Sequence, residues 1–140
     1  MSKAHSVLLV EDDQADAYIT QKVFRNIAED IALSHTETGE SALEWLAACQ
    51  EQDTLPELIL LDLNMPRMDG FTFLEHAKRE HALRSIPVVV LTTSAAQGDV
   101  DRAYTLGAVG YVVKPTSIDD FTHYMQQLVG YWFNLVKRPD

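Results

Sequence analysis

Acidic side chains follow two short apolar segments of the chain. Glu11 and Asp12 follow the apolar residues 7–10, and Asp62 follows the apolar residues 58–61. Uninterrupted apolar runs of this length are typical of parallel strands that are covered on both faces. Because the ligands of such sheets bind outside the carboxyl ends of the strands, we expect these carboxylates to face one another. Like charges that close need a cation, and magnesium suits them because it takes few protein carboxylates, keeps waters and accepts a phosphoryl oxygen. Manganese or calcium could replace it.

Phosphoryl transfer is the chemistry that such a site could perform. An ionised carboxylate such as Asp62 can act as a nucleophile and form an aspartyl phosphate. Two more polar residues end later apolar segments, since Thr92 follows PVVVL and Lys114 follows GYVV. The Lys114 ammonium would neutralise charge on the phosphoryl oxygens, and the Thr92 hydroxyl would donate a hydrogen bond to one of them.

Alternating strand and helix patterns predict the elements that would position these residues. Besides the two apolar segments above, strands are expected at 31–36, 88–91 and 110–113, and a helix at about 40–50. The first helix is indicated by apolar residues at every fourth position: Ala15, Ile19, Val23 and Ile27. Five βα units with right-handed crossovers predict a flavodoxin-like α/β fold, which is a doubly wound five-stranded parallel sheet in the order 2-1-3-4-5 flanked by five helices.

Length, charge and cysteine content narrow the function classes. With 140 residues of which 46% are hydrophobic, the chain is expected to form one domain over residues 1–140 without a separate output domain. The formal net charge of -10 disfavours binding to nucleic acids or to anionic membranes. The single cysteine, Cys49, can form no intramolecular disulfide, and the N-terminus lacks a secretory pattern, so we expect a cytoplasmic location.

Four motifs occur in an order and spacing that resemble a known family. They are VLLVEDD, LILLDLNMPRMDG, PVVVLTTS and GAVGYVVKP, and they cover residues 6 to about 128. They resemble the receiver domains of two-component response regulators. The resemblance implies a signalling phosphoacceptor and not an enzyme, although such domains assist their own phosphorylation and autodephosphorylation.

The resemblance also implies a role for each acidic residue. Asp62 matches the phosphoacceptor, and a sensor histidine kinase would donate the phosphoryl group. Asp12 matches the acid that ligates magnesium directly, and Glu11 matches the acid that acts through a water. The backbone carbonyl of Asn64 matches the third protein ligand.

A conformational switch is the next implication of the resemblance. Thr92 matches the switch hydroxyl, Tyr111 the switch aromatic, and Lys114 the lysine that contacts the phosphoryl group. On phosphorylation, Thr92 would draw residues 93–97 inward, and Tyr111 would fill the space that they leave. The peptide bond from Lys114 to Pro115 would be cis, which would turn Lys114 into the site.

Other residues carry a lesser role or an ordinary structural alternative. Asn64 and Ser94 match variable positions that would tune the lifetime of the aspartyl phosphate. Asp13, with Asp16 three residues later, resembles a helix cap. Tyr111 could simply pack against the core.

The C-terminal segment is unusually apolar. A helix is expected from about 117 to 137, with Ser117 as its cap. One apolar stripe could face the sheet: Phe121, Tyr124, Met125, Leu128, Trp132 and Leu135. A second stripe cannot share that face, so we expect a homodimer through this helix and neighbouring elements, with a surface formed by Val129, Tyr131, Trp132, Phe133 and Val136. The alternative is that the tail folds back over the core of its own domain.

Three segments resemble a particular subgroup of receivers. VEDDQAD, LTTS and YWFNLV are similar to single-domain regulators that pair with bacterial phytochrome-type histidine kinases. A face around the first helix would then select the kinase: Asp16, Tyr18, Ile19 and Lys22. A chemotaxis-type or phosphorelay-intermediate receiver is the alternative within the family.

Alternatives outside the receiver family are also open. A haloacid-dehalogenase-like phosphohydrolase would also carry an aspartate after an apolar strand. Asn64 stands where that family needs a second acid, and its nucleophile follows the first strand. A receiver-shaped scaffold that is never phosphorylated is disfavoured because no position of the site is missing.

Overall fold

Five parallel strands form a single sheet in the order β2-β1-β3-β4-β5, which confirms the predicted topology. The computed structural model describes residues 5–65 and 67–137. The strands are β1 His5–Val10, β2 Ile31–Thr36, β3 Leu58–Leu61, β4 Val88–Thr92 and β5 Gly110–Val113. Each apolar segment that was expected to form a strand does so, with bounds that differ by at most two residues.

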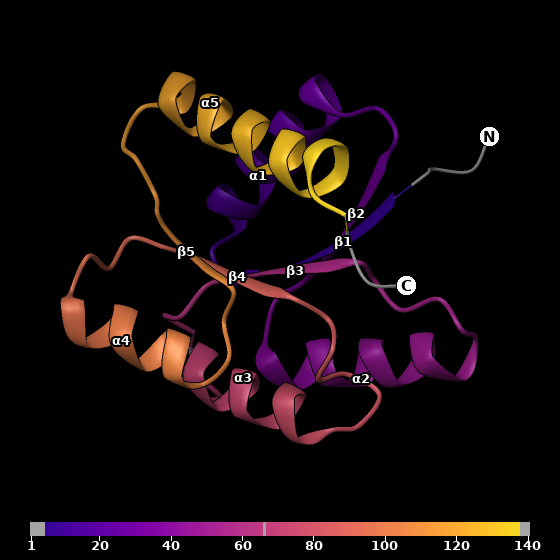
Figure 1. The fold of residues 1–140 in the computed structure, drawn as a ribbon. Coiled ribbons are helices and arrows are strands. Elements are labelled where there is room, and N and C mark those ends of the chain that lie inside the picture. The colour runs from indigo at the N-terminus through magenta and orange to yellow at the C-terminus, as the bar shows by residue number, and fades with distance from the viewer. Residues whose placement is uncertain (1–4, 66, 138–140) are drawn as a thin grey trace.

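Helices cover both faces of this sheet, as right-handed crossovers require. They are α1 Gln14–Ile27, α2 Gly39–Glu51, α3 Gly70–Arg79, α4 Gln97–Thr105 and α5 Ile118–Val129. Helices α1 and α5 lie on one face, and α2, α3 and α4 lie on the other (Figure 1). Among the described residues, no helix is both long and apolar enough to cross a membrane.

Short polar side chains cap α1 and α5 where these helices leave the carboxyl edge of the sheet. Asp13 Oδ1 accepts a hydrogen bond from the Asp16 amide at 2.9 Å, and Ser117 Oγ accepts one from the Asp120 amide at 3.3 Å. Both caps were predicted. Because each satisfies an amide that has no partner within the helix, they fix where α1 and α5 leave the sheet.

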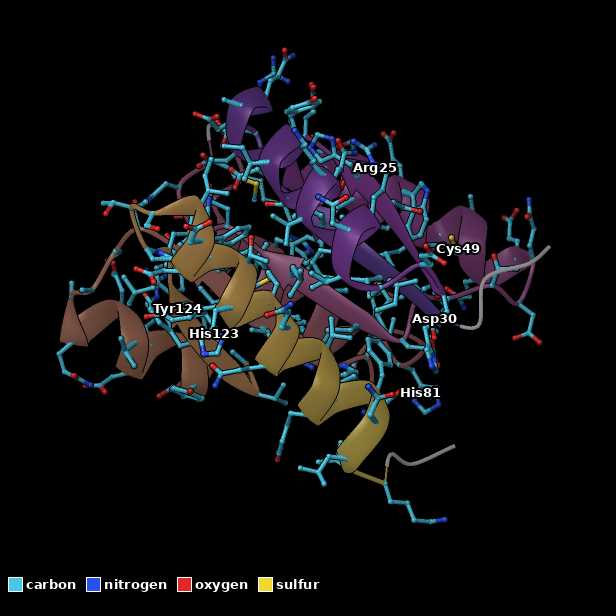
Figure 2. All side chains as sticks on the ribbon, turned by 90° about the horizontal axis from the view of Figure 1, so that it is seen from above. Arg25, Asp30, Cys49, His81, His123 and Tyr124 are labelled. Carbon is cyan, nitrogen blue, oxygen red and sulfur yellow. The ribbon has the colours of Figure 1, made fainter. Side chains whose placement is uncertain are left out.

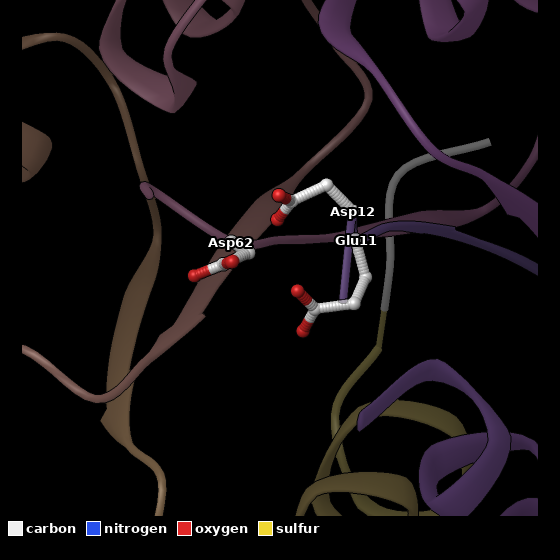
Figure 3. Close-up of side chains that lie close together, drawn as sticks. All are labelled: Glu11, Asp12 and Asp62. Carbon is white, nitrogen blue, oxygen red and sulfur yellow. The ribbon is translucent and has the colours of Figure 1, made fainter. Parts of the chain in front are cut away.

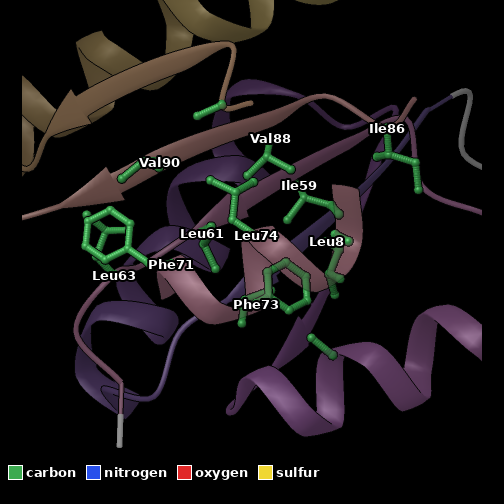
Figure 4. Close-up of a cluster of buried hydrophobic side chains, with 14 of the residues drawn as sticks. Leu8, Ile59, Leu61, Leu63, Phe71, Phe73, Leu74, Ile86, Val88 and Val90 are labelled. Carbon is green, nitrogen blue, oxygen red and sulfur yellow. The ribbon is translucent and has the colours of Figure 1, made fainter. Parts of the chain in front are cut away.

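The three central strands form the core. The side chains of β3 and β4 are fully buried, and they pack against a separate apolar cluster on each face of the sheet. In the cluster under α2 and α3, Phe73 and Leu74 pack against Leu8 and Ile59 (Figure 4). Burial on both faces explains why these strands read as uninterrupted apolar runs.

The buried face of α1 differs from the predicted stripe. Ala15 is exposed, whereas Ala17, Thr20 and Phe24 are buried. The Thr20 hydroxyl donates to the Asp16 carbonyl at 2.8 Å. A threonine satisfied by its own helix can be buried at little cost, and for this reason a search for apolar residues alone places the stripe wrongly.

The C-terminal segment is helical to Leu135, but it is not one α-helix. After α5, the residues Gly130–Leu135 form a π-helix, η1. Its wider turn lets Leu128, Val129, Trp132 and Phe133 all pack against the cluster under α1 and α5. The Phe133 ring stacks on His5 with centroids 4.4 Å apart.

The predicted assignment of the two C-terminal stripes is therefore partly wrong. Val129, Trp132 and Phe133 cover the core of their own domain, which is the alternative of a tail that folds back. Tyr124 and Leu135 were expected to face the sheet, but their side chains are 41% and 75% exposed. Tyr131 remains on the surface at 55% exposure, as predicted.

Candidate functional site

Three carboxylates meet at the carboxyl edge of the sheet. Val10 is the register partner of Leu61, so Glu11 and Asp62 leave neighbouring strands at the same level. One carboxylate oxygen from each of Glu11, Asp12 and Asp62 lies within 4.8 Å of the other two. Figure 3 shows the three side chains gathered at this edge. The convergence predicted from the strand ends is present.

The electrostatics of this cluster are unfavourable without a cation. Glu11 and Asp62 are buried, and Asp12 is partly buried. Burial, together with a hydrogen bond to Asp62, raises the pKa of Glu11 to about 8, against the opposing effect of Lys114. A set of oxygen ligands alone, with excess negative charge and partial exposure, fits a hard divalent ion such as Mg²⁺. In that case Glu11, Asp12 and Asp62 would hold it.

Lys114 enters the same pocket from the end of β5. Its amide donates to the Thr92 carbonyl at 2.7 Å, which extends the pairing of β5 with β4 by one residue. Its ammonium forms ion pairs with Glu11 Oε1 at 2.5 Å and with Asp16 Oδ2 at 3.1 Å. The remaining walls of this pocket come from the strand ends and α1: Asp12, Asp13, Asp62, Asn64 and Thr93.

The prediction of a cis peptide bond before Pro115 is wrong. The described residues contain no cis peptide bond, so the bond from Lys114 to Pro115 is trans. The trans form is intrinsically favoured by about 0.5–1 kcal/mol. The Lys114 ammonium reaches Glu11 from this trans bond.

Asn64 lies beside Asp62, and Thr92 lies beside Asn64. The Thr92 side chain is fully buried at the end of β4, and Asn64 Nδ2 lies 3.5 Å from its hydroxyl oxygen. The backbone N–H of Asn64 donates to Asp62 Oδ1 at 3.4 Å. Asn64 is therefore next to Asp62, and Thr92 is next to Asn64.

Tyr111 and Ser94 are connected at the start of the loop into α4. The Tyr111 hydroxyl donates to the Ser94 carbonyl at 2.9 Å, and burial raises the pKa of Tyr111. The Ser94 hydroxyl donates to Asp99 Oδ2 at 2.6 Å, so this side chain is directed to α4. Tyr111, the predicted switch aromatic, is therefore hydrogen-bonded to the loop 93–97, whose movement it was expected to accompany.

Two residues of the site were not identified from the sequence. Asp16 was interpreted as part of a cap and of a kinase-binding face, and its contact with Lys114 was not foreseen. His35 Nε2 donates to the Glu11 carbonyl at 2.7 Å, a contact that no sequence motif indicated. For Asp16, the sequence offered one indication: it lies one helical turn after the Asp13 cap, near the acidic strand end.

A doubly wound sheet with a lysine and a hydroxyl beside an acidic pocket defines a class of phosphoacceptor proteins. Residues 7–126 match the response regulator receiver domain family. The probable methanogenesis regulatory protein FilR2 of Methanothrix harundinacea is 35% identical over 95% of this chain and 86% of its own length. Response regulator Rcp1 of Synechocystis is 36% identical over 95% of this chain and 92% of its own length.

Solved structures agree with this match. The phosphorylated cyanobacterial phytochrome response regulator RcpA is 29% identical, with a TM-score of 0.89 over 97% of this chain and 99% of that chain. The Mn²⁺-bound form of Rcp1 gives a TM-score of 0.85 at 35% identity, over 97% of this chain and 99% of that chain. The chain belongs to the response regulator receiver family and is a phosphoacceptor of two-component signalling.

Proposed function

We propose that Asp62 receives the phosphoryl group from a sensor histidine kinase and that Mg²⁺ is bound by Glu11, Asp12 and Asp62, with the Asn64 backbone carbonyl as a further ligand. The observation that carries this proposal is the approach of three carboxylates to within 4.8 Å of one another. When bound, the ion would offset the negative charge of the phosphoryl oxygens. The Mn²⁺ bound to Rcp1 supports a divalent cation in this family.

The side chains around Asp62 have separate roles in the transfer. An oxygen of the Asp62 carboxylate attacks phosphorus, and the bond from phosphorus to the donor atom breaks, which leaves an acyl phosphate on Asp62. Lys114 offers a compact positive charge to the phosphoryl oxygens. The Thr92 hydroxyl donates a hydrogen bond to a phosphoryl oxygen, and the movement of Thr92 is passed to the loop that holds Ser94.

The conformational change and the lifetime of the aspartyl phosphate depend on residues near Asp62. Tyr111 moves with the loop because its hydroxyl is bonded to the Ser94 carbonyl. Asn64 and Ser94 would tune how fast water removes the phosphoryl group, and the 3.5 Å distance from Asn64 Nδ2 to the Thr92 hydroxyl oxygen supports this role for Asn64. Autodephosphorylation then resets the switch.

A phytochrome-type histidine kinase is the proposed donor. The similarity to RcpA, a phytochrome response regulator, supports this pathway. A groove beside the phosphorylation site is lined by Asp16, Ile19 and residues 114–118. Tyr18 and Lys22 are exposed on α1 next to Ile19, so the predicted kinase-binding face is accessible. A cytoplasmic location and the absence of nucleic-acid and membrane binding remain predictions.

The test of the proposed function uses the full chain and a small phosphodonor. With Mg²⁺ and acetyl phosphate, intact-mass measurement should show one phosphoryl group per chain, stable in acid and lost in base. Chelation of the metal should prevent its incorporation. No incorporation, or repeated hydrolysis of a phosphomonoester, would contradict a phosphoacceptor role.

We also propose a homodimer through α5 and its neighbours, with a revised surface. Val113 on β5, Tyr124 on α5, and Tyr131 and Leu135 on η1 are all exposed apolar side chains. Tyr124 projects from α5 beside His123 (Figure 2). Exposed apolar residues that recur along one helix are usually covered by a partner, and two-fold pairing is the commonest way to cover them.

Substitution of two tyrosines on this surface should lower the particle mass in solution. Tyr124→Glu with Tyr131→Glu should reduce the particle mass from that of two chains to that of one, because two buried carboxylates would oppose pairing. Light scattering measures this mass. Tyr18→Glu is the matched control, since Tyr18 is 58% exposed but lies on α1. A wild type with the mass of one chain would refute the proposed dimer.

A further inference from the structure

Asp16 connects the phosphorylation pocket with the groove between α1 and α5. It lines both, and its side chain is 42% exposed. The backbone at this position is fixed, because the Asp16 amide donates to Asp13 and the Asp16 carbonyl accepts from Thr20. A carboxylate on such a backbone is a stable anchor for a flexible partner.

Lys114 is that partner. Its ammonium has three N–H donors on a flexible four-carbon stem. One donor goes to Glu11 and one to Asp16, which places the ammonium at the wall of the pocket nearest α1. Among the described residues, no ion pair joins Lys114 to Asp62. The third donor is therefore available to an incoming group.

The position of the ammonium matters for the reactivity of Asp62. A lysine bonded directly to the Asp62 carboxylate would occupy a lone pair of one oxygen and make the carboxylate less nucleophilic. A lysine held by Glu11 alone could rotate toward Asp62, since both carboxylates lie at the same edge of the sheet. Asp16 attracts the ammonium toward α1, because it lies on that helix and not among the three clustered acids.

We propose that Asp16 is a positioning residue for phosphoryl transfer, which anchors the Lys114 ammonium beside Asp62 without contact with its nucleophilic oxygens. The inference rests on the proposed function, because it assigns a role within that same transfer. In this role the Asp16 carboxylate does not contact the phosphoryl group and acts only through Lys114.

The first test compares phosphorylation rates with acetyl phosphate and saturating Mg²⁺, so that kinase docking on α1 plays no part. Asp16→Asn should lower the rate about tenfold, since small misplacements at a reacting centre are costly. Asp16→Glu should keep most of the wild-type rate, because the negative charge is kept. Asp119→Asn should leave the rate unchanged, since Asp119 is an exposed acid in the first turn of α5 and is not an ion-pair partner of Lys114.

The second test separates positioning from a general loss of structure. In a Lys114→Met background, Asp16→Asn should cause no further decrease, because the group that it positions is gone. Thermal unfolding of each variant verifies that the fold is kept. An unchanged rate for Asp16→Asn, a tenfold decrease that persists without Lys114, or a rate for Asp16→Glu as low as that for Asp16→Asn would overturn the inference. A wild type that gains no phosphoryl group would instead overturn the proposed function and this inference with it.

Discussion

Replacement of Asp62 by asparagine is expected to abolish phosphorylation completely. The amide oxygen of asparagine carries no negative charge, so it cannot attack phosphorus and form a stable acyl phosphate. The loss should exceed about a thousandfold in rate, because the nucleophile itself is removed and not merely misaligned. Intact-mass measurement after incubation with Mg²⁺ and acetyl phosphate would show one phosphoryl group on the wild type and none on the variant.

Two further measurements make this prediction specific to Asp62. Asp101→Asn is the matched control, because Asp101 is an exposed acid on α4 whose carboxylate accepts a hydrogen bond from Gln97. It should be phosphorylated like the wild type. Asp62→Asn should also remain folded, and without metal it should unfold at a higher denaturant concentration, because one of the crowded carboxylates has lost its charge. A phosphoryl group on another residue of the variant would contradict the assignment.

The sheet could be predicted from the sequence because its strands are buried on both faces. Segments 7–10, 58–61 and 88–91 have no polar residue to interrupt them, so they could be interpreted only as buried strands or short buried helices, and their length favoured strands. Chain connectivity then required parallel pairing, and parallel pairing brought Asp12 and Asp62 to one edge. Local composition was therefore sufficient for the topology and for the acidic cluster.

Features that depend on tertiary contacts were not predictable in the same way. The pairing of Lys114 with Asp16 depends on how α1 packs beside α5, and no sequence pattern indicates that packing. The π-helical turn at Gly130–Leu135 allows Trp132 and Phe133 to pack on the core together. A search that assumes 3.6 residues per turn assigns Phe133 to an outward face and Trp132 to both faces.

Glu11→Gln is expected to change how stability depends on pH in the absence of metal. Burial and the neighbouring Asp62 raise the pKa of Glu11 from 4.5 to about 8 in the folded protein, despite the ion pair with Lys114. Between these values the folded state holds a proton that the unfolded state has lost, so stability must fall as pH rises. The contribution is complete below pH 4.5 and is lost as pH rises through about 8. Its upper bound is about 5 kcal/mol, at 1.36 kcal/mol for each pKa unit.

Urea unfolding from pH 5 to pH 8.5 with a chelator would measure this dependence. Wild-type protein should lose stability over that range, whereas Glu11→Gln should lose much less, because glutamine does not titrate. Glu37→Gln is the matched control, since Glu37 is an exposed acid near the same edge of the sheet and should keep the wild-type slope. Saturating Mg²⁺ should abolish the wild-type slope between pH 5 and about 8, because the metal-bound folded state and the unfolded state then both lack the Glu11 proton. Equal slopes for wild type and Glu11→Gln would show that Glu11 does not hold the proton, and that the acidic cluster tolerates its charge by other means.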